Sequence, residues 1–210
     1  MTSAEPARSV EIELKLDADD TTPLPDLAAL PGVVSVTAGE VHLLDARYLD
    51  TAELNLARAG FALRRRTGGP DAGWHVKGPL VDGARVELRW PLGEPGPVPA
   101  DIVRMLAELT GASPDALAGL APVARIRNER TAYLLLDAAG ATIAEFADDR
   151  VAATDERAGV QRAWREWELE LGDRPPRDPA AFFAAATAAM RSVGAAPATS
   201  VSKLARALGA

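Results

Sequence analysis

The chain has 210 residues, of which 48% are hydrophobic and 25% are charged, and this composition is typical of a globular domain with a sizeable core. It has no cysteine, which excludes disulfides and thiolate metal sites, and its formal net charge of -7 argues against the basic surface of a duplex nucleic-acid binder. No apolar run is long enough to span a membrane and no signal peptide opens the chain, so we expect a cytoplasmic protein with a single domain over residues 1–210.

The first predicted strand covers residues 9–17 and alternates strictly between apolar and charged residues. Glu11, Glu13 and Lys15 share its charged face. Carboxylates at positions i and i+2 of a strand point the same way, about 7 Å apart. Mg2+ usually takes one or two carboxylates together with phosphate oxygens of a substrate, so this face is a candidate metal site. The alternative is an ordinary strand with a solvated outer face.

The rest of the chain predicts further strands and a few helices. Alternating patterns bounded by turn residues mark the strands, and Pro at the first helical position or Gly just past the last marks the helices. Strands are expected near residues 33–37, 40–49, 60–67, 73–78, 84–92, 123–128, 130–137, 141–153 and 161–171. Helices are expected near residues 99–110, 113–119, 179–193 and 200–208.

The polar faces of several predicted strands are almost wholly ionic. The rows are Arg64 with Arg66, His75 with Lys77, Arg85 with Glu87 and Arg89, Arg125 with Arg127, and Glu166 with Glu168 and Glu170. The chain has only three lysines, and two of them, Lys15 and Lys77, lie in such rows. If these faces turn inward, they form a closed antiparallel barrel with a cationic lumen and acidic metal ligands. The four tryptophans are expected to pack in the apolar core.

The segment Glu11-x-Glu13-x-Lys15 resembles the ExExK signature of the CYTH domain, a member of the triphosphate tunnel metalloenzyme superfamily. A lone ExExK is a weak signal, but further segments match in order over nearly the whole chain. They are Tyr48–Thr51, Leu54–Gly60, Ala62–Gly68, Lys77–Pro79, Arg85–Glu87, Arg127–Tyr133, Ala144–Val151, Glu166–Leu171 and Ser202–Leu204. The resemblance implies an α+β fold, in which a closed antiparallel eight-stranded β-barrel has its helices packed outside.

The resemblance also implies a metal site for Mg2+ or Mn2+, with two ions when substrate is bound. The matched metal ligands are Glu11, Glu13, Glu168 and Glu170, with Asp149 as a further ligand. Asp148 is the alternative to Asp149, and strand parity favours Asp149 because it shares the face of Glu145.

The matched cations are expected to hold phosphate oxygens, with Arg as a bidentate partner and Lys as a point charge. They are Lys15, Arg64, Arg66, Lys77, Arg85, Arg130 and Lys203, with Arg125 and Arg127 as additional candidates. Strand parity places Arg125 and Arg127 opposite Arg130 unless a bulge lies at Asn128-Glu129. The residues expected to act in catalysis are Glu168, Glu170, Lys77 and Arg64.

The function implied by the resemblance is metal-dependent hydrolysis of inorganic triphosphate, or of a related triphosphate or polyphosphate. Two alternatives stay open: a class IV-type adenylate cyclase, which would need an adenine pocket, and a polyphosphate-binding module without turnover. CYTH domains are often followed by a helical CHAD domain implicated in polyphosphate binding, so such a domain is a candidate partner. The full set of carboxylates favours catalysis, because the capture of an anion does not need so many of them.

Overall fold

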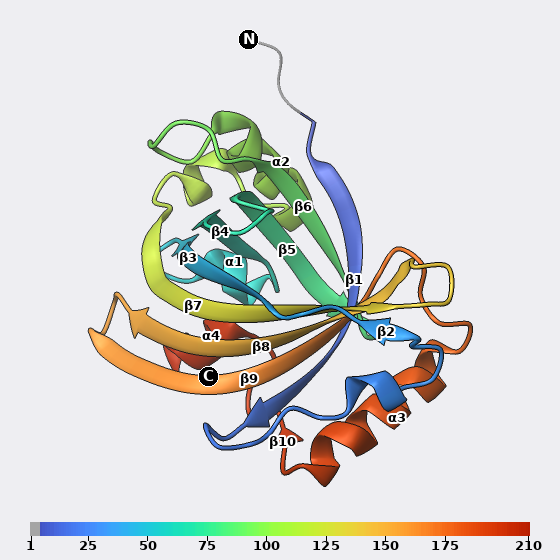
Figure 1. The fold of residues 1–210 in the computed structure, drawn as a ribbon. Helices are drawn as coiled ribbons and strands as arrows, with labels where there is room; N and C mark the ends of the chain where they lie inside the picture. The colour runs from blue at the N-terminus through green and yellow to red at the C-terminus, as the bar shows by residue number, and fades with distance from the viewer. Residues whose placement is uncertain (1–4) are drawn as a thin grey trace.

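The computed structural model describes residues 5–210 and has a closed antiparallel barrel of eight strands (Figure 1). The strands pair in the order β1-β6-β5-β4-β3-β7-β8-β9, and pairing of β9 with β1 closes the barrel. They are β1 (Ala7–Ala18), β3 (Glu40–Asp50), β4 (Ala62–Thr67), β5 (Gly73–Val81), β6 (Ala84–Pro91), β7 (Ala121–Leu136), β8 (Thr142–Asp155) and β9 (Val160–Leu171). The predicted fold class is confirmed; residues 1–4 of the predicted domain lie outside the described residues.

Closure of the barrel takes place along β1. The first half of this strand pairs with β6 and the second half pairs with β9. The facing pairs include Glu11 with Arg85, Glu13 with Glu170, and Lys15 with Glu168. Because successive side chains point to opposite faces of a strand, this register turns the charged faces of all three strands toward one lumen.

The strand β7 replaces two strands that were predicted separately, over 123–128 and 130–137. Its pairing with β3 and with β8 continues without a break from Arg125 to Thr131, so no bulge lies at Asn128-Glu129. Strand parity therefore holds through this stretch. Arg125 and Arg127 face the opposite side of the sheet from Arg130.

The remaining elements lie outside the barrel strands. Those that match predicted elements are β2 (Ser35–Val36), α2 (Ala100–Thr110), α3 (Pro179–Ser192) and α4 (Lys203–Leu208), while the helix predicted over 113–119 is a 3-10 turn, η2 (Pro114–Leu117). The elements that were not predicted are η1 (Leu27–Ala29), α1 (Asn55–Arg58) and β10 (Ala196–Pro197). Among residues 5–210, no helix combines the length and the apolar character needed to cross a membrane.

Two hydrophobic clusters lie between the outer face of the barrel and the surrounding helices, and a third, which includes Ala46, Ile126 and Leu204, borders the lumen. Phe146 and Trp167 are fully buried, with their ring centroids 5.6 Å apart, and Phe182 of α3 packs into the same cluster. A second cluster packs Trp74 and Trp90 against α2. These aromatic rings support the barrel wall from outside, so they leave the lumen to other side chains.

The buried carboxylate of Asp50 holds the unpredicted helix α1. Its Oδ1 accepts hydrogen bonds from the backbone N–H groups of Thr51, at 2.7 Å, and Leu56, at 2.9 Å, and its Oδ2 accepts one from Ala57, at 2.9 Å. We expect Asp50→Ala to lower the free energy of unfolding by about 1–3 kcal/mol, because buried donors lose their acceptor. Urea denaturation measures the loss. Glu53→Ala, an exposed change in the same loop, should have little effect, and equal losses in both variants would contradict the assignment.

Candidate functional site

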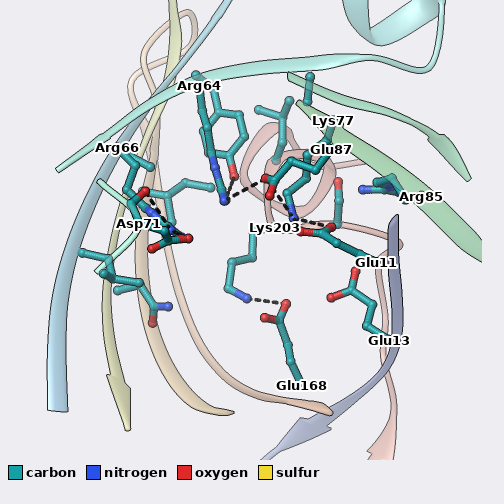
Figure 2. A pocket seen from close by; sticks show the side chains of 18 of the residues that line it. Glu11, Glu13, Arg64, Arg66, Asp71, Lys77, Arg85, Glu87, Glu168 and Lys203 are labelled. Carbon is teal, nitrogen blue, oxygen red and sulfur yellow. Dashed lines mark hydrogen bonds and ion pairs between the residues drawn. The ribbon is translucent and has the colours of Figure 1, made fainter. Parts of the chain in front are cut away.

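The lumen of the barrel contains a cavity of about 110 Å³ that is lined mainly by ionic side chains. The lining cations are Lys15, Arg64, Arg66, Lys77, Arg85, Arg130 and Lys203, and the lining carboxylates are Glu11, Glu13, Asp71, Glu87, Glu168 and Glu170. In Figure 2 the labelled members of this set, which come from several strands and from α4, point into a common space. Four of the five rows of charged residues seen in the sequence therefore contribute to one cavity, and the row of Arg125 and Arg127 does not.

Glu87 organises the wall formed by β4, β5 and β6. Its Oε1 lies 3.0 Å from Nδ1 of His75, 3.5 Å from Arg64 and 3.6 Å from Lys77. Burial opposes the charge on Glu87, but the hydrogen bond from His75 and the two cations outweigh it and hold its pKa below the usual range. Lys77 also donates hydrogen bonds of 2.9 and 2.7 Å to Glu11. Glu87 is therefore an ionised anchor that orients the neighbouring cations.

His75 is the fully buried partner of Glu87. Burial and the charge on Arg64 lower its pKa to about 4, although the hydrogen bond to Glu87 acts in the opposite direction. Its Nδ1 lies 3.0 Å from Oε1 of Glu87 and its Nε2 lies 3.0 Å from the backbone carbonyl oxygen of Asp71, so the ring serves as a hydrogen-bonding support. His75 lies behind the cations of the cavity wall instead of lining the cavity with them.

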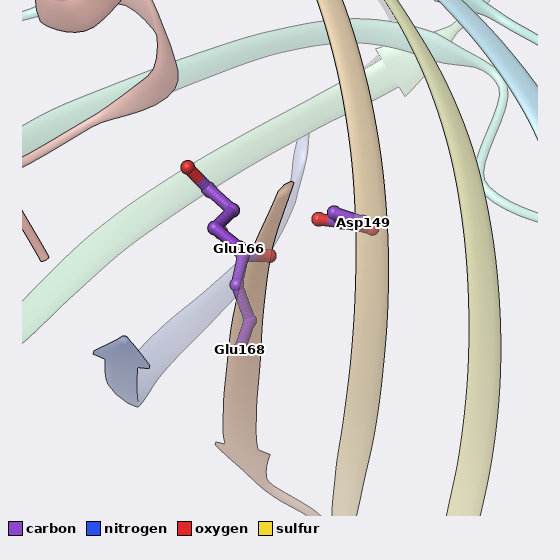
Figure 3. A group of neighbouring side chains, drawn as sticks. All are labelled: Asp149, Glu166 and Glu168. Atoms are coloured by element: carbon purple, nitrogen blue, oxygen red, sulfur yellow. The ribbon is translucent and has the colours of Figure 1, made fainter. Parts of the chain in front are cut away.

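Lys203 brings the helix α4 into contact with the lumen. Ser202 caps this helix, since its Oγ accepts a hydrogen bond from the backbone N–H of Ala205 at 3.1 Å. The cap places the side chain of the next residue, Lys203, inside the barrel, where its Nζ lies 2.6–2.7 Å from three carboxylates. They are Asp149, Glu166 and Glu168, on the neighbouring strands β8 and β9 (Figure 3). Burial opposes the charge on Lys203, but these carboxylates outweigh it and raise its pKa well above the usual range.

The three carboxylates around Lys203 are buried, and one ligand atom from each lies within 4.8 Å of the others, as in a metal site. The ammonium of Lys203 already lies among them, and Arg130 binds Asp149 and Glu168 from the other side. Burial raises the pKa of Asp149, but Lys203 and Arg130 outweigh burial and lower it. The negative charge of this cluster is thus balanced by the protein itself.

Glu170, unlike the carboxylates around Lys203, has no cation paired with it among residues 5–210. Within residues 5–210 it forms no ion pair and no hydrogen bond through its carboxylate. Burial and the facing carboxylate of Glu11 raise its pKa to about 7, and Glu13 acts in the same direction. Burial likewise raises the pKa of Glu11, although Lys77 opposes this. Glu11, Glu13 and Glu170 therefore form an acidic group that lacks enough positive charge.

We expect Glu170→Gln to stabilise the metal-free protein at alkaline pH. A group whose folded-state pKa is raised, here from 4.5 to about 7, contributes its full stability below pH 4.5 and loses that contribution as the pH rises through 7. The uncharged amide avoids the loss, so the variant should be more stable than the wild type by about 1–3 kcal/mol at pH 8. Urea denaturation in EDTA at pH 5 and pH 8 measures the difference. A gain of the same size at both pH values would contradict the raised pKa.

The structure brings nearly all the predicted site residues together. The predicted metal and substrate ligands on β1, β4, β5, β6, β9 and α4 line the cavity, as does Arg130, while Asp149 lies directly behind Lys203 and Arg130. Asp148 faces away and binds Arg165, in agreement with the preference for Asp149.

Arg125 and Arg127 do not line the tunnel. Arg125 forms a bidentate pair with Asp45, with its Nε 3.0 Å from Oδ1 and its Nη2 2.5 Å from Oδ2. Arg127 is exposed on the same outer face. The expectation that these two arginines face the phosphate was wrong in its geometry, because the unbroken register of β7 keeps them on the outside.

Tyr48 is a lumen residue that the sequence reasoning missed. Its hydroxyl accepts a hydrogen bond of 3.3 Å from Nη1 of Arg64. Burial opposes ionisation of Tyr48, but Arg64 outweighs it and lowers the pKa. The lumen face of β3 is Leu44, Ala46 and Tyr48, so no ionic row marked this strand. The matching segment Tyr48–Thr51 was the available signal.

Comparison with known proteins identifies relatives over almost the full chain. Residues 9–205 match the family model of the CYTH domain. The uncharacterized protein Rv2226 of Mycobacterium tuberculosis is 38% identical over 216 residues, and so is the uncharacterized protein MT2285 from another strain. The match covers 98% of this chain but 41% of each relative, so the chain spans less than half the length of these proteins.

Solved structures share the fold at low sequence identity. A putative adenylate cyclase of Bacillus halodurans has a TM-score of 0.63 and 15% identity, over 95% of this chain and 97% of the other. HpAC1 of Hippeastrum, a putative adenylyl cyclase described as having a dominant triphosphatase activity, has a TM-score of 0.58 and 20% identity, over 94% of this chain and 95% of the other. The fold, the charged tunnel and the family match over residues 9–205 agree, and the chain belongs to the CYTH domain family.

Proposed function

We propose that this single domain hydrolyses a triphosphate inside the barrel with the aid of bound Mg2+ or Mn2+. The observation that supports this best is the meeting of seven cations with the unpaired carboxylate of Glu170 in one cavity. A polyanion needs the cations, and a hard divalent ion needs the uncompensated carboxylates. A site for a polyanion alone would not need the carboxylates, and a site for a metal ion alone would not need the cations.

Glu11, Glu13 and Glu170 fit the metal best, because within residues 5–210 these three carboxylates are paired with two cations, Lys77 and Lys15. Burial and the neighbouring carboxylates raise the pKa of Glu170 to about 7, and a divalent ion would remove this penalty. A bound ion would supply charge neutralisation at the phosphates and a more acidic water. Asp149 and Glu168 are occupied by Lys203 and Arg130, so we assign them to holding these two cations.

The cations of the tunnel are arranged to exchange partners when substrate binds. Lys77 is paired with Glu11, and Lys15 with Glu13 at 3.2 Å, so phosphate oxygens could take the ammonium groups while the metal takes the carboxylates. Arg85 is already available: within residues 5–210 it forms no ion pair, and its buried Nε has no hydrogen-bond partner. Arg64 and Lys77, which line the cavity, would stabilise the charge that develops on the transferred phosphoryl group.

We expect phosphate release to be faster from inorganic triphosphate than from ATP. Within residues 5–210, the one aromatic side chain lining the cavity is buried Tyr48, bonded to Arg64, so no ring there is available to stack on a base. The test compares inorganic triphosphate, ATP, thiamine triphosphate and long-chain polyphosphate with Mg2+ or Mn2+. Cyclic AMP and pyrophosphate from ATP would favour the cyclase. Tight polyphosphate binding without release would favour a binding module, a role suited to a partner domain of the CHAD type.

A further inference from the structure

The outer wall of the barrel carries a second group of arginines, separate from the tunnel. Arg65 on β4, Arg47 on β3 and Arg125 on β7 lie directly opposite one another in register. Arg127 follows two residues after Arg125 on the same face. Like charges at directly opposed positions destabilise a sheet, so this arginine row of three neighbouring strands calls for compensating negative charge.

The described part of the chain supplies little of that charge. Asp45 binds Arg125 in a bidentate pair. The hydrogen bonds from Arg125 lower the pKa of Asp45, and the charges of Arg127 and Arg47 act in the same direction. Within residues 5–210, Arg47, Arg65 and Arg127 form no ion pair. Arg65 lies 6.0 Å from the ring centroid of Trp74, and its buried Nε has no hydrogen-bond partner. Within residues 5–210, Asp45 is the carboxylate that forms an ion pair with this group, and Glu156 adds negative charge near Arg125, in a chain whose formal net charge is -7.

Arg47, Arg65 and Arg125 line a groove of about 480 Å³ on the outside of the barrel, and Arg127 follows on the same face of β7. The groove lies between the strands and two segments, 95–98 and 120–122, which contribute apolar walls. Val98 and Leu120 are half-buried, and the neighbouring prolines are exposed. The groove therefore combines guanidinium groups with apolar surface. An inorganic phosphate chain could use the guanidinium groups, but it has no apolar part for the walls.

We propose that this groove binds an acidic segment of a partner protein. Asp or Glu side chains of the segment pair with Arg47, Arg65 and Arg127 in the way that Asp45 pairs with Arg125, and an apolar side chain between them packs against the walls. The bidentate pair of Arg125 shows the contact that the arginine row makes with a carboxylate. Charge complementarity selects the partner. The net negative charge of the chain repels an acidic segment, but the local positive charge of the arginine row attracts it to this groove.

The test uses fluorescence anisotropy with a labelled peptide of alternating Glu and Leu, and a Lys–Leu peptide as the control ligand. The double variant Arg47→Met and Arg65→Met removes two charges but keeps unbranched apolar stems, including the stem beside Trp74. We expect it to bind the acidic peptide about tenfold more weakly, the upper range for two exposed ion pairs. The matched double variant Arg174→Met and Arg177→Met, exposed elsewhere, should bind as the wild type does, and binding should weaken with salt.

Three results would overturn the proposal. The first is no binding of the acidic peptide to the wild type at low salt, or equal binding by the Arg47 and Arg65 variant. The second is loss of binding in the tunnel variant Arg64→Ala with binding retained in the double variant, since that would place the peptide in the tunnel. The third is tighter binding of inorganic polyphosphate than of the peptide at the arginine row, lost in the double variant. Thermal melting of each variant shows that the fold is kept.

Discussion

Replacement of Glu170 by Gln should lower the rate of triphosphate hydrolysis by a factor on the order of 100 or more, the scale seen when one group that stabilises transition-state charge is removed. Glu13→Gln should have a similar effect. Both residues belong to the acidic group of Glu11, Glu13 and Glu170, in which negative charge exceeds positive charge, and a neutral amide is a poor ligand for Mg2+. Removal of divalent ions with EDTA should reproduce the loss in the wild type.

The stability of Glu170→Gln separates a metal defect from a folding defect. Because burial and Glu11 raise the pKa of Glu170 to about 7, the variant should be inactive and yet more stable than the wild type at pH 8 without metal. Glu108→Gln, an exposed change on α2, is the matched control and should retain activity. Undiminished turnover by the wild type in EDTA would rule out the proposed role of the acidic group.

The barrel could be predicted from the sequence because the inner faces of most of its strands carry charged side chains. The alternation over Glu11, Glu13 and Lys15 predicts both the strand and the charged face that turns toward the lumen. The same logic failed on β3, whose lumen face is Leu44, Ala46 and Tyr48, because an apolar inner face looks like any packed strand. The alternating pattern predicted a strand near residues 40–49, but only the resemblance of Tyr48–Thr51 to the family pointed to a role for Tyr48.

Strand parity was reliable wherever the register was unbroken. It selected Asp149 over Asp148, and the structure buries Asp149 against Arg130 and Lys203. It also opposed a lumen position for Arg125 and Arg127, which their place in a row of charged residues had suggested. Parity is a local consequence of the pleat, whereas a motif match carries no information about which face a neighbouring residue takes.

Pairing between distant segments could not be read from the sequence. Nothing local shows that Lys203, on a short helix at the end of the chain, reaches three carboxylates of β8 and β9. The helix α1 was missed for a similar reason, since it is four residues long and depends on the buried carboxylate of Asp50. Such elements are stabilised by tertiary contacts, which outweigh local propensity in short segments.

Replacement of Lys203 by Met should be the most destabilising change in the tunnel, with a loss of about 3–5 kcal/mol in the free energy of unfolding at pH 7, because removal of one partner leaves buried charge uncompensated. The Nζ of Lys203 lies 2.7 Å from Asp149, 2.6 Å from Glu166 and 2.7 Å from Glu168. All three carboxylates are buried. Met keeps most of the side-chain volume, so the measured loss reports mainly the missing charge.

The loss should depend on pH in a defined direction. In the wild type, burial opposes the charge on Glu168, but Lys15, Lys203 and Arg130 outweigh it and hold its pKa well below the usual range. A carboxylate with a depressed folded-state pKa stabilises the fold above its unfolded pKa, and this stability is lost as the pH falls through the folded value. The variant lacks part of that stabilisation, so the gap between the two proteins should narrow as the pH is lowered from 7 to about 3, below the unfolded-state pKa of 4.5. Urea denaturation at both pH values measures it.

A second change tests whether the carboxylates cause the loss. Glu166→Gln in the Lys203→Met background removes one uncompensated charge and should restore part of the stability at pH 7. Arg206→Met, on the same helix and also paired with a carboxylate, is the control for general damage to α4 and should cost less, since its side chain is more exposed than that of Lys203. A loss in Lys203→Met that is independent of pH and unchanged by Glu166→Gln would mean that Lys203 acts through packing of α4 and not by neutralising the carboxylates of the tunnel.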